Sequence, residues 1–168
     1  MQADIRDATP HDLPAIVDLL NATLASTTYE YTDIAHSIAT RTAWFEQQRQ
    51  RRFPVLVAIV DGAAVGFAAY GDFRDSLARP GYRFTVEHSV HVAESHRGAG
   101  IGRALMDALI ERARAGGAHV MVGGIDSSNV DSIRFHERLG FVETARMPEV
   151  GRKFERWLDL VLMQKILT

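Results

Sequence analysis

The hydrophobic positions of this chain change period several times, which indicates that strands and helices alternate along it. Two continuous apolar runs, residues 54–60 and 63–70, flank Asp61-Gly62, a dipeptide typical of a hairpin turn. Residues 84–92 alternate instead. One predicted face carries Phe84, Val86, His88, Val90 and Val92, and the other carries Thr85, Glu87, Ser89 and His91. Further strands are expected at residues 3–7, 118–125, 141–147 and 153–166.

Apolar residues at helical spacing predict four helices. Thr9-Pro10-His11-Asp12 is typical of a helix start, with a Thr cap, Pro in the first helical position and a carboxylate three residues after the cap. The segments are residues 10–20, 33–51, 101–116 and 130–139. Residues 21–31 have no period but contain Tyr29 and Glu30, so this loop either lines a substrate pocket or lies on the surface.

This order of elements predicts one α/β (α+β) domain over residues 1–168, with a mixed, mostly antiparallel sheet flanked by helices. Its length and its 46% hydrophobic content suffice for a sizeable core. No linker, repeat or low-complexity segment divides the chain.

Charge and composition exclude several classes of function. The 19 basic and 21 acidic residues give a net charge of −2, and the one basic run, residues 49–52, ends a predicted helix, so we expect no nucleic-acid partner. The absence of cysteine excludes disulfides, thiolate–zinc sites and a cysteine nucleophile. Without a signal pattern or a membrane-spanning apolar run, a cytoplasmic protein with no membrane partner is expected. No metal is expected either, because His88 and His91 fall on opposite strand faces.

The stretch His96-Arg97-Gly98-Ala99-Gly100-Ile101-Gly102-Arg103 lies between a predicted strand and a predicted helix. Its glycines expose the N–H groups of the first helical turn, and its arginines add positive charge, so it suits a pyrophosphate. A P-loop needs Gly-Lys-Ser/Thr, and the dinucleotide fingerprint needs a different glycine spacing after the first strand. A glycine-rich turn without a ligand remains the alternative.

Three motifs in this order carry a family resemblance. Arg97, Gly100 and Gly102 fit the pattern Arg/Gln-x-x-Gly-x-Gly/Ala, which resembles the acyl-CoA loop of the GNAT N-acetyltransferases. Residues 129–141, with Asn129, Ser132 and His136, resemble a second GNAT segment in which tyrosine usually stands where His136 does. Residues 85–90 and 134–141 are similar to the phosphinothricin acetyltransferase subfamily. Residues 147–159 resemble its branch that acetylates methionine sulfoximine, methionine sulfone and phosphinothricin.

The resemblance implies the GNAT fold and acetyl-CoA as co-substrate. It assigns the pantetheine arm to the main chain of Val90, His91 and Val92. It assigns the pyrophosphate to Arg97, Gly98, Ala99, Gly100, Ile101, Gly102 and Arg103, and the reactive end of the cofactor to Asn129 and Ser132. An N–H of the strand, with that of Val92 as the candidate, would bind the oxyanion.

Two residues are candidates for proton transfer. Glu87 is the candidate base for the substrate ammonium, because partial burial would raise its pKa; the alternative is a carboxylate that faces solvent or pairs with an arginine. His136 is the candidate acid for the leaving thiolate, and it could equally act as base, orient Glu87 or serve only in packing.

Recognition of an amino acid calls for an arginine opposite its carboxylate, and Arg74 is the first candidate, with Arg83 second. His88 and Ser89 are added by resemblance. The expected pocket walls include Phe73 and Tyr82, and also Tyr29, Lys153 and Trp157. A homodimer is implied by the resemblance.

The predicted function is direct acetyl transfer, in a ternary complex, to the α-amine of a small amino-acid analogue. The alternatives are another amine, such as a peptide N-terminus or an aminoglycoside, and a non-catalytic acyl-CoA-binding module.

Overall fold

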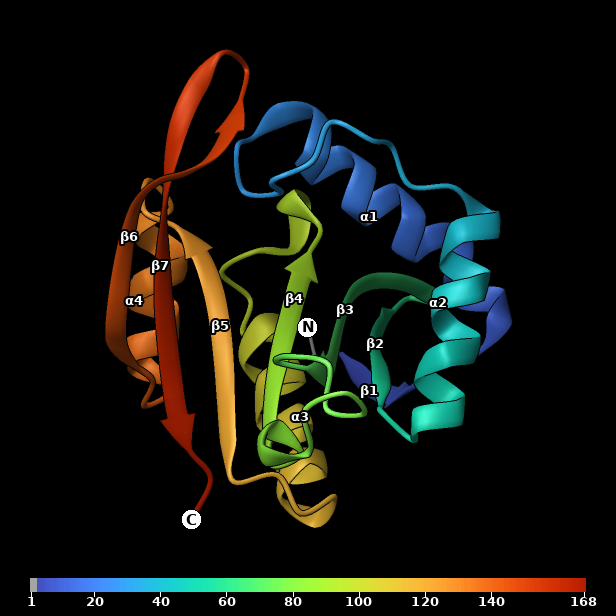
Figure 1. The fold of residues 1–168 in the computed structure, drawn as a ribbon. Helices are drawn as coiled ribbons and strands as arrows, with labels where there is room; N and C mark the ends of the chain where they lie inside the picture. The colour runs from blue at the N-terminus through green and yellow to red at the C-terminus, as the bar shows by residue number, and fades with distance from the viewer. Residues whose placement is uncertain (1–2) are drawn as a thin grey trace.

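The strands form a seven-stranded sheet in the order β1-β2-β3-β4-β5-β7-β6, in which only β4 and β5 run parallel. In this computed structural model, which describes residues 3–168, helices cover both faces (Figure 1). The strands are β1 (Asp4–Asp7), β2 (Val55–Val60), β3 (Ala63–Asp72), β4 (Thr85–Val92), β5 (Val120–Asp126), β6 (Val142–Lys153) and β7 (Arg156–Ile166). The helices are α1 (Leu13–Ser26), α2 (Ile38–Arg51), α3 (Ile101–Ala115) and α4 (Val130–Arg138). Met1 and Gln2, part of the predicted domain, lie outside the described residues.

The alternation of side chains in the central strands builds a core on each face of the sheet. On one face, Leu13, Ile16 and Leu20 of α1 and Phe45 of α2 pack on Val55, Val57, Phe67 and Ala69. On the other, α3 contributes Leu105, Met106 and Leu109 to a core that continues through Val86 and Met121 to Phe141 near α4. The predicted mixed, mostly antiparallel sheet between helices is confirmed.

The parallel pair β4 and β5 separates soon after it begins. Only Thr85–Val120, Val86–Met121 and Glu87–Val122 are paired, although β4 continues to Val92 and β5 to Asp126. The chain beyond β4 returns through a short 3₁₀ turn, Glu94–His96, and the glycine loop to the start of α3. The second halves of β4 and β5 therefore form the two walls of an opening in the sheet.

Two helix boundaries differ from the sequence-based prediction. The helix expected over residues 33–51 begins only at Ile38, because Ser37 caps it through a 3.1 Å hydrogen bond from the N–H of Thr40 to its Oγ. His36 is held outside the helix by the side chain of Asn21, which binds both its N–H and its carbonyl. Conversely, α1 continues to Ser26, through part of the segment predicted as a loop.

The C-terminal hairpin also differs. The sequence predicts two strands separated by residues 148–152, where proline and glycine occur, but β6 continues to Lys153. The irregular segment is a bulge between Met147 and Gly151, tolerated because β6 is an edge strand. The turn lies instead at Phe154 and Glu155, which both have left-handed backbone angles, φ 49° and 58°.

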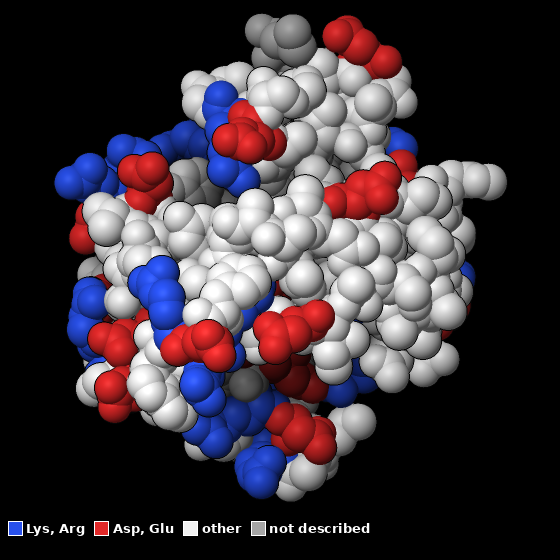
Figure 2. Space-filling model, turned by 90° about the horizontal axis from the view of Figure 1, so that it is seen from above, with Lys and Arg blue, Asp and Glu red and all other residues white. Residues whose placement is uncertain are grey.

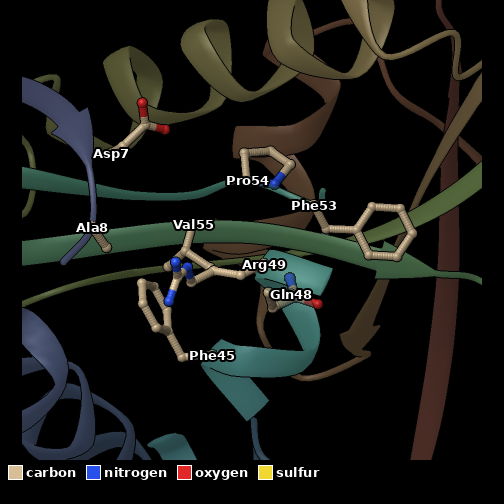
Figure 3. Close-up of a pocket in the computed structure, with 8 residues that line it drawn as sticks. All are labelled: Asp7, Ala8, Phe45, Gln48, Arg49, Phe53, Pro54 and Val55. Atoms are coloured by element: carbon tan, nitrogen blue, oxygen red, sulfur yellow. The ribbon is translucent and has the colours of Figure 1, made fainter. Parts of the chain in front are cut away.

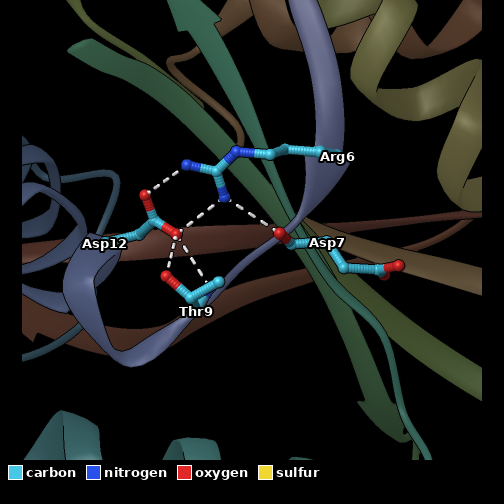
Figure 4. A network of polar contacts seen from close by, with 4 residues as sticks. All are labelled: Arg6, Asp7, Thr9 and Asp12. Atoms are coloured by element: carbon cyan, nitrogen blue, oxygen red, sulfur yellow. Dashed lines mark hydrogen bonds and ion pairs between the residues drawn. The ribbon is translucent and has the colours of Figure 1, made fainter. Parts of the chain in front are cut away.

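The predicted helix start at Thr9 is confirmed, with one 3₁₀ turn, Pro10–Asp12, before α1. Asp12 is buried there, accepts hydrogen bonds from the N–H and hydroxyl of Thr9, and forms a two-point ion pair with Arg6 of β1 (Figure 4). The hydrogen bonds from Arg6 lower the pKa of Asp12 to about 2, against the opposing effect of burial. This carboxylate fastens α1 to the first strand.

We expect Asp12→Asn to lower the free energy of unfolding by about 1–2 kcal/mol at pH 7, because the charged hydrogen bonds from Arg6 are lost. A group with a lowered folded-state pKa stabilises the protein above its unfolded value. The wild-type advantage should thus shrink between pH 3.8 and about pH 2, as Asp12 becomes protonated. Urea titrations at several pH values measure this. Asp18→Asn, an exposed carboxylate of α1, is the matched control and should differ little from wild type; an equal loss in both variants would contradict the assignment.

Candidate active site

The opening between β4 and β5 is a groove of about 670 Å³ that extends from the glycine loop to α4 and the α1–α2 loop. Most of the predicted cofactor residues border it, namely Val90, His91, Val92, Arg97, Gly98, Gly100, Gly102, Arg103, Asn129 and Ser132. His88, Ser89 and His136 border it as well. Residues distant in the sequence thus converge on one surface, as the predicted acyl-CoA site requires.

The glycine loop presents backbone at the start of a four-turn helix. Gly98 and Gly100 adopt left-handed angles, φ 77° and 82°, and a Cβ at either would meet no atom within 4 Å. At Gly102 a Cβ would make ordinary contacts with the Phe135 ring, at 3.5 Å, and with Val92 Cγ2, at 3.7 Å. These positions leave the N–H groups of α3 open to an anion, which the helix dipole favours. Ala99 and Ile101 do not border the groove, and Ile101 belongs to the core.

The main chain of β4 offers free hydrogen-bonding groups to the groove. The N–H of Ala93 bonds the carbonyl of Val65, and that of Phe73 bonds Thr85, so odd-numbered β4 residues pair with β3. In an antiparallel pair the intervening residues face away, here toward β5. Val90 and Val92 therefore direct their N–H groups into the groove, where β5 has diverged, whereas the main chain of His91 pairs with Phe67 of β3. The Val92 carbonyl accepts a 3.3 Å bond from Arg97 Nε.

The start of α4 forms the other wall. Asn129 caps this helix, with its Oδ1 accepting a 3.2 Å bond from the N–H of Ser132. Asp126 at the end of β5 is buried and accepts from the N–H and hydroxyl of Ser128, while its Oδ2 has no partner among the described residues. The sequence indicated Asp126 as a capping residue but not as part of the groove, which it borders.

Glu87 lies on the face of β4 that is covered by α1 and α2. Its Oε1 lies close to Gly124 of β5: a Cβ added to that glycine would be 3.4 Å from Oε1. Burial raises its pKa, and burial is the sole cause of the shift. The side chain is half-buried, and among the described residues no ion pair joins it to an arginine, which was one of the two alternatives that the sequence left open. It lies beside the groove rather than among the residues that border it.

His88 and His136 meet on the opposite face. Their Nε2 atoms are 2.9 Å apart, His88 Nδ1 is 2.9 Å from the Val122 carbonyl, and His136 Nδ1 is 2.7 Å from the Ser132 carbonyl. Burial lowers the pKa of both rings. The idea that His136 orients Glu87 is wrong, because successive residues of β4 point to opposite faces and place His88, not Glu87, against His136.

His91 shares the face of Glu87. Its ring stacks on Phe67 at 5.1 Å, and its Nε2 lies 3.2 Å from Glu30 Oε1. Burial, the largest single effect, would raise the pKa of Glu30, but the hydrogen bond from His91 together with the charges of His91, His36 and Lys153 outweighs it, and the net shift is downward. His88 and His91 therefore lie on opposite faces as predicted. Tyr29 and Glu30 border the groove, and a role of their loop in binding substrate stays a prediction.

The predicted substrate residues Arg74, Phe73 and Tyr82 form a separate cluster. The guanidinium of Arg74 lies 5.5 Å from the Phe73 ring and 5.7 Å from the Tyr82 ring, in the loop before β4, and none of the three borders the groove. The second candidate, Arg83, stacks on Phe84 at 4.3 Å.

Two expected pocket walls are corrected by the structure. Lys153 is buried, and its Nζ donates to the carbonyls of Leu24, Thr27 and Glu30. It fastens the end of α1 and the following loop to the hairpin. Trp157 is 60% exposed, with Arg152 over its ring. The sequence missed these roles because each depends on contacts between distant segments.

The face drawn in Figure 2 carries charges of both signs, and a second pocket lies away from Glu87 and His136. Seen from the end where the glycine loop lies, acidic and basic side chains are interspersed over part of the surface and the rest is uncharged (Figure 2). A nucleic-acid-binding face would carry a continuous basic patch. A second, smaller pocket of about 210 Å³ lies between α2 and β2 (Figure 3), and neither Glu87 nor His136 borders it. Within residues 3–168, no helix is long and apolar enough to cross a membrane.

Comparisons with known proteins agree with this geometry. Residues 16–141 match the model of the acetyltransferase (GNAT) family. An L-methionine sulfoximine/L-methionine sulfone acetyltransferase of Pseudomonas aeruginosa is 48% identical over 165 residues, 98% of this chain and 94% of the relative. An L-amino acid N-acyltransferase of Escherichia coli is 46% identical, over 95% of this chain and 91% of its own.

A solved structure of similar shape contains the co-substrate. The phosphinothricin acetyltransferase of Sinorhizobium meliloti, determined in complex with acetyl-CoA, superimposes with a TM-score of 0.92 at 34% identity, over 99% of this chain and 89% of its own. The open β4–β5 groove, the glycine loop at a helix N-terminus and the family match lead to one conclusion. The chain belongs to the GNAT family of acetyltransferases and takes acetyl-CoA as its co-substrate.

Proposed function

We propose that this enzyme transfers the acetyl group of acetyl-CoA to the α-amine of a small amino acid of the methionine sulfoximine and methionine sulfone type. The observation that carries the proposal is the 48% identity, over nearly the whole chain, to a relative named for those substrates. Phosphinothricin is a further candidate, because the same fold serves an acetyltransferase named for it. A general amino-acid acceptor is supported by the relative named as an L-amino acid N-acyltransferase.

The acetyl-CoA side of the reaction is assigned to the groove. The main-chain groups of Val90 and Val92 that face the gap suit the amides of the pantetheine arm, as an added strand would. The glycine loop, with Arg97 and Arg103, suits the pyrophosphate. Arg103 lies 3.4 Å from Asp107, so part of its charge is already balanced, and Arg97 provides the stronger attraction. The N–H of Val92 is the candidate donor to the oxyanion.

Glu87 is the proposed base. An amino acid carries an ammonium group at neutral pH, which must lose a proton before its nitrogen attacks the thioester. Burial raises the pKa of Glu87, so its carboxylate accepts that proton more readily than an exposed one. The deprotonated amine then attacks acetyl-CoA directly in a ternary complex. His136, on the opposite wall, is the proposed donor to the departing thiolate.

The acceptor is proposed to enter from the face covered by α1 and α2, past Tyr29 and Glu30, because Glu87 lies on that face. Arg74 remains the candidate for its carboxylate. In one chain Arg74 does not border the groove, so its use requires that the β3–β4 loop of the same chain or of a second copy approach it.

A homodimer is proposed as well, supported by exposed apolar side chains on the C-terminal hairpin, among them Met147, Val150 and Trp157. A cytoplasmic location remains a prediction from the sequence.

Release of CoA thiol with a panel of amines tests the substrate class. We expect turnover with methionine sulfone, methionine sulfoximine and phosphinothricin, and none with a short peptide or an aminoglycoside. An amino-acid acceptor bears a carboxylate that an arginine recognises, which the aminoglycoside lacks. Turnover confined to the peptide or the aminoglycoside would overturn the substrate class but not the use of acetyl-CoA.

Glu87→Gln should lower kcat by on the order of 100-fold, because the amide cannot accept the ammonium proton. In the wild type, kcat/KM should rise with pH as Glu87 ionises, through a pKa above the usual 4.5 because burial raises it. Steady-state rates between pH 5 and 9 measure both effects. Glu137→Gln, an exposed carboxylate on α4, should keep the wild-type rate. An unchanged profile in Glu87→Gln would assign the base elsewhere.

A comparison of Gly100→Ala with Gly62→Ala distinguishes the loss of an anion-binding site from the effect of backbone strain alone. Both glycines are left-handed, at φ 82° and φ 80°, with open space around them, so each variant should lose about 1 kcal/mol of stability. Only Gly100→Ala displaces the N–H groups of α3, and its Kd for acetyl-CoA should rise roughly tenfold, or about 1.4 kcal/mol. Calorimetric titration measures the Kd. Equal effects of the two variants on binding would argue against the glycine loop as the pyrophosphate site.

A further inference from the structure

The two histidines on the α3–α4 face of the groove form a buried pair. Both rings are nearly inaccessible, with 8% of His88 and 3% of His136 exposed. The ring centroids lie 5.1 Å apart, and Phe141 packs against both rings at 5.3 Å. Three elements position the pair: β4 supplies His88, α4 supplies His136, and β5 supplies the carbonyl of Val122.

Hydrogen-bond geometry determines how many protons the pair holds. A carbonyl oxygen can only accept, so each Nδ1 that contacts one carries a proton: His88 against Val122 at 2.9 Å and His136 against Ser132 at 2.7 Å. The two Nε2 atoms, 2.9 Å apart, need one proton between them. Three protons on four nitrogens give the pair one positive charge. If the pair held only two protons, one of these three contacts would have none: a nitrogen lone pair would face either a carbonyl oxygen or the lone pair of the other Nε2, which is repulsive at these distances.

We propose that His88 and His136 hold this third proton in common, as an imidazolium–imidazole pair, and that His88 is a positioning residue that keeps His136 charged for the departing thiol. The proposal rests on the proposed function, in which His136 is the proton donor. In the step itself, the N–H bond breaks, an S–H bond forms on the CoA thiolate, and the pair becomes neutral. Solvent in the groove then returns one proton to the pair.

The surroundings make the shared proton easy to release. Burial, and then repulsion from His136, lower the pKa of His88, while burial lowers that of His136. No carboxylate among the described residues faces the pair: Glu87 of β4 lies on the other face, and Asp126 of β5 shares the side of Gly124 and Glu87. From α4 the neighbour is Ser132, and Phe135 and Phe141 complete the surroundings. The charge is thus held by hydrogen bonds alone.

The structure also provides a path by which a proton can pass between the histidine pair and the groove. The hydroxyl of Ser132 lies 3.4 Å from His136 Nδ1 and borders the groove, as do both histidines. The ring of His88 fits because position 123 is glycine: a Cβ there would lie 2.7 Å from His88 Cε1. The absence of this Cβ allows the imidazole to lie where β4 and β5 begin to diverge.

Nitrogen-15 NMR of the histidine rings in the full chain, without substrate, tests the proton count. At the acid end of a pH titration we expect both Nδ1 atoms to be protonated and the two Nε2 atoms to share one proton; on raising the pH, both rings should change together with one apparent pKa below the usual 6.5, because burial lowers the pKa of each ring. His88→Phe and His136→Phe identify the signals, and His119→Phe, an exposed ring remote from the groove, is the control. If either Nδ1 lacks a proton throughout pH 5–9, the proposal is wrong.

Kinetics supply the second measurement. His88→Phe retains a ring but no nitrogen, so the proton on His136 Nε2 loses its acceptor. We expect kcat to fall on the order of tenfold at pH 7, with the alkaline limb of the profile moved to lower pH and the KM for acetyl-CoA little changed. A wild-type profile in this variant would overturn the role of His88 while leaving the proposed function intact. A wild-type enzyme inactive on every amine would refute the proposed function, and the NMR result would still decide the proton count.

Discussion

The early divergence of β4 and β5 is the constraint on which the rest of the site depends. Parallel strands normally satisfy each other's main-chain groups, but here only three residue pairs do so before the strands separate. The main chain of Val90 and Val92 is left facing a gap, and an extended ligand can satisfy it. The position of α3 follows from the same divergence, because the glycine loop carries the chain from the end of β4 to the N-terminus of that helix.

Side chains alternate between the two faces of β4, and this alternation places the residues proposed for proton transfer on opposite sides of the strand. Glu87 and His88 are neighbours in sequence, yet they lie on opposite faces of β4, one with the α1–α2 side and one with α4. Glu87, the proposed base, therefore faces the side from which we propose that the amine enters, and the histidine pair lies on the other side. Gly124 and Gly123 of β5 make room for these two side chains, one glycine for each face. Burial acts on both, raising the pKa of the carboxyl and lowering those of the imidazoles.

Long-range polar contacts hold the loop after α1 to the C-terminal hairpin and to β4. Lys153 in the C-terminal hairpin binds three carbonyls at the end of α1 and in the loop after it, including that of Glu30. Glu30 in turn pairs with His91 of β4. A residue expected to contact substrate thus has a structural role instead. A buried ammonium is stable only when several acceptors surround it, and that condition leaves Lys153 no free proton for a ligand.

The sequence by itself determined the order of the elements, the groove's glycine loop and the family, because hydrophobic period, glycine spacing and short motifs are local properties of the chain. It also placed Glu87 and His88 on opposite faces. Only the tertiary structure decided that His136 meets His88 rather than Glu87, that α2 begins at Ile38, and that Arg74 lies with Phe73 and Tyr82 outside the groove. These outcomes depend on contacts between segments far apart in the chain, such as the 48 residues that separate His88 from His136, and no local pattern specifies which partner a side chain will meet.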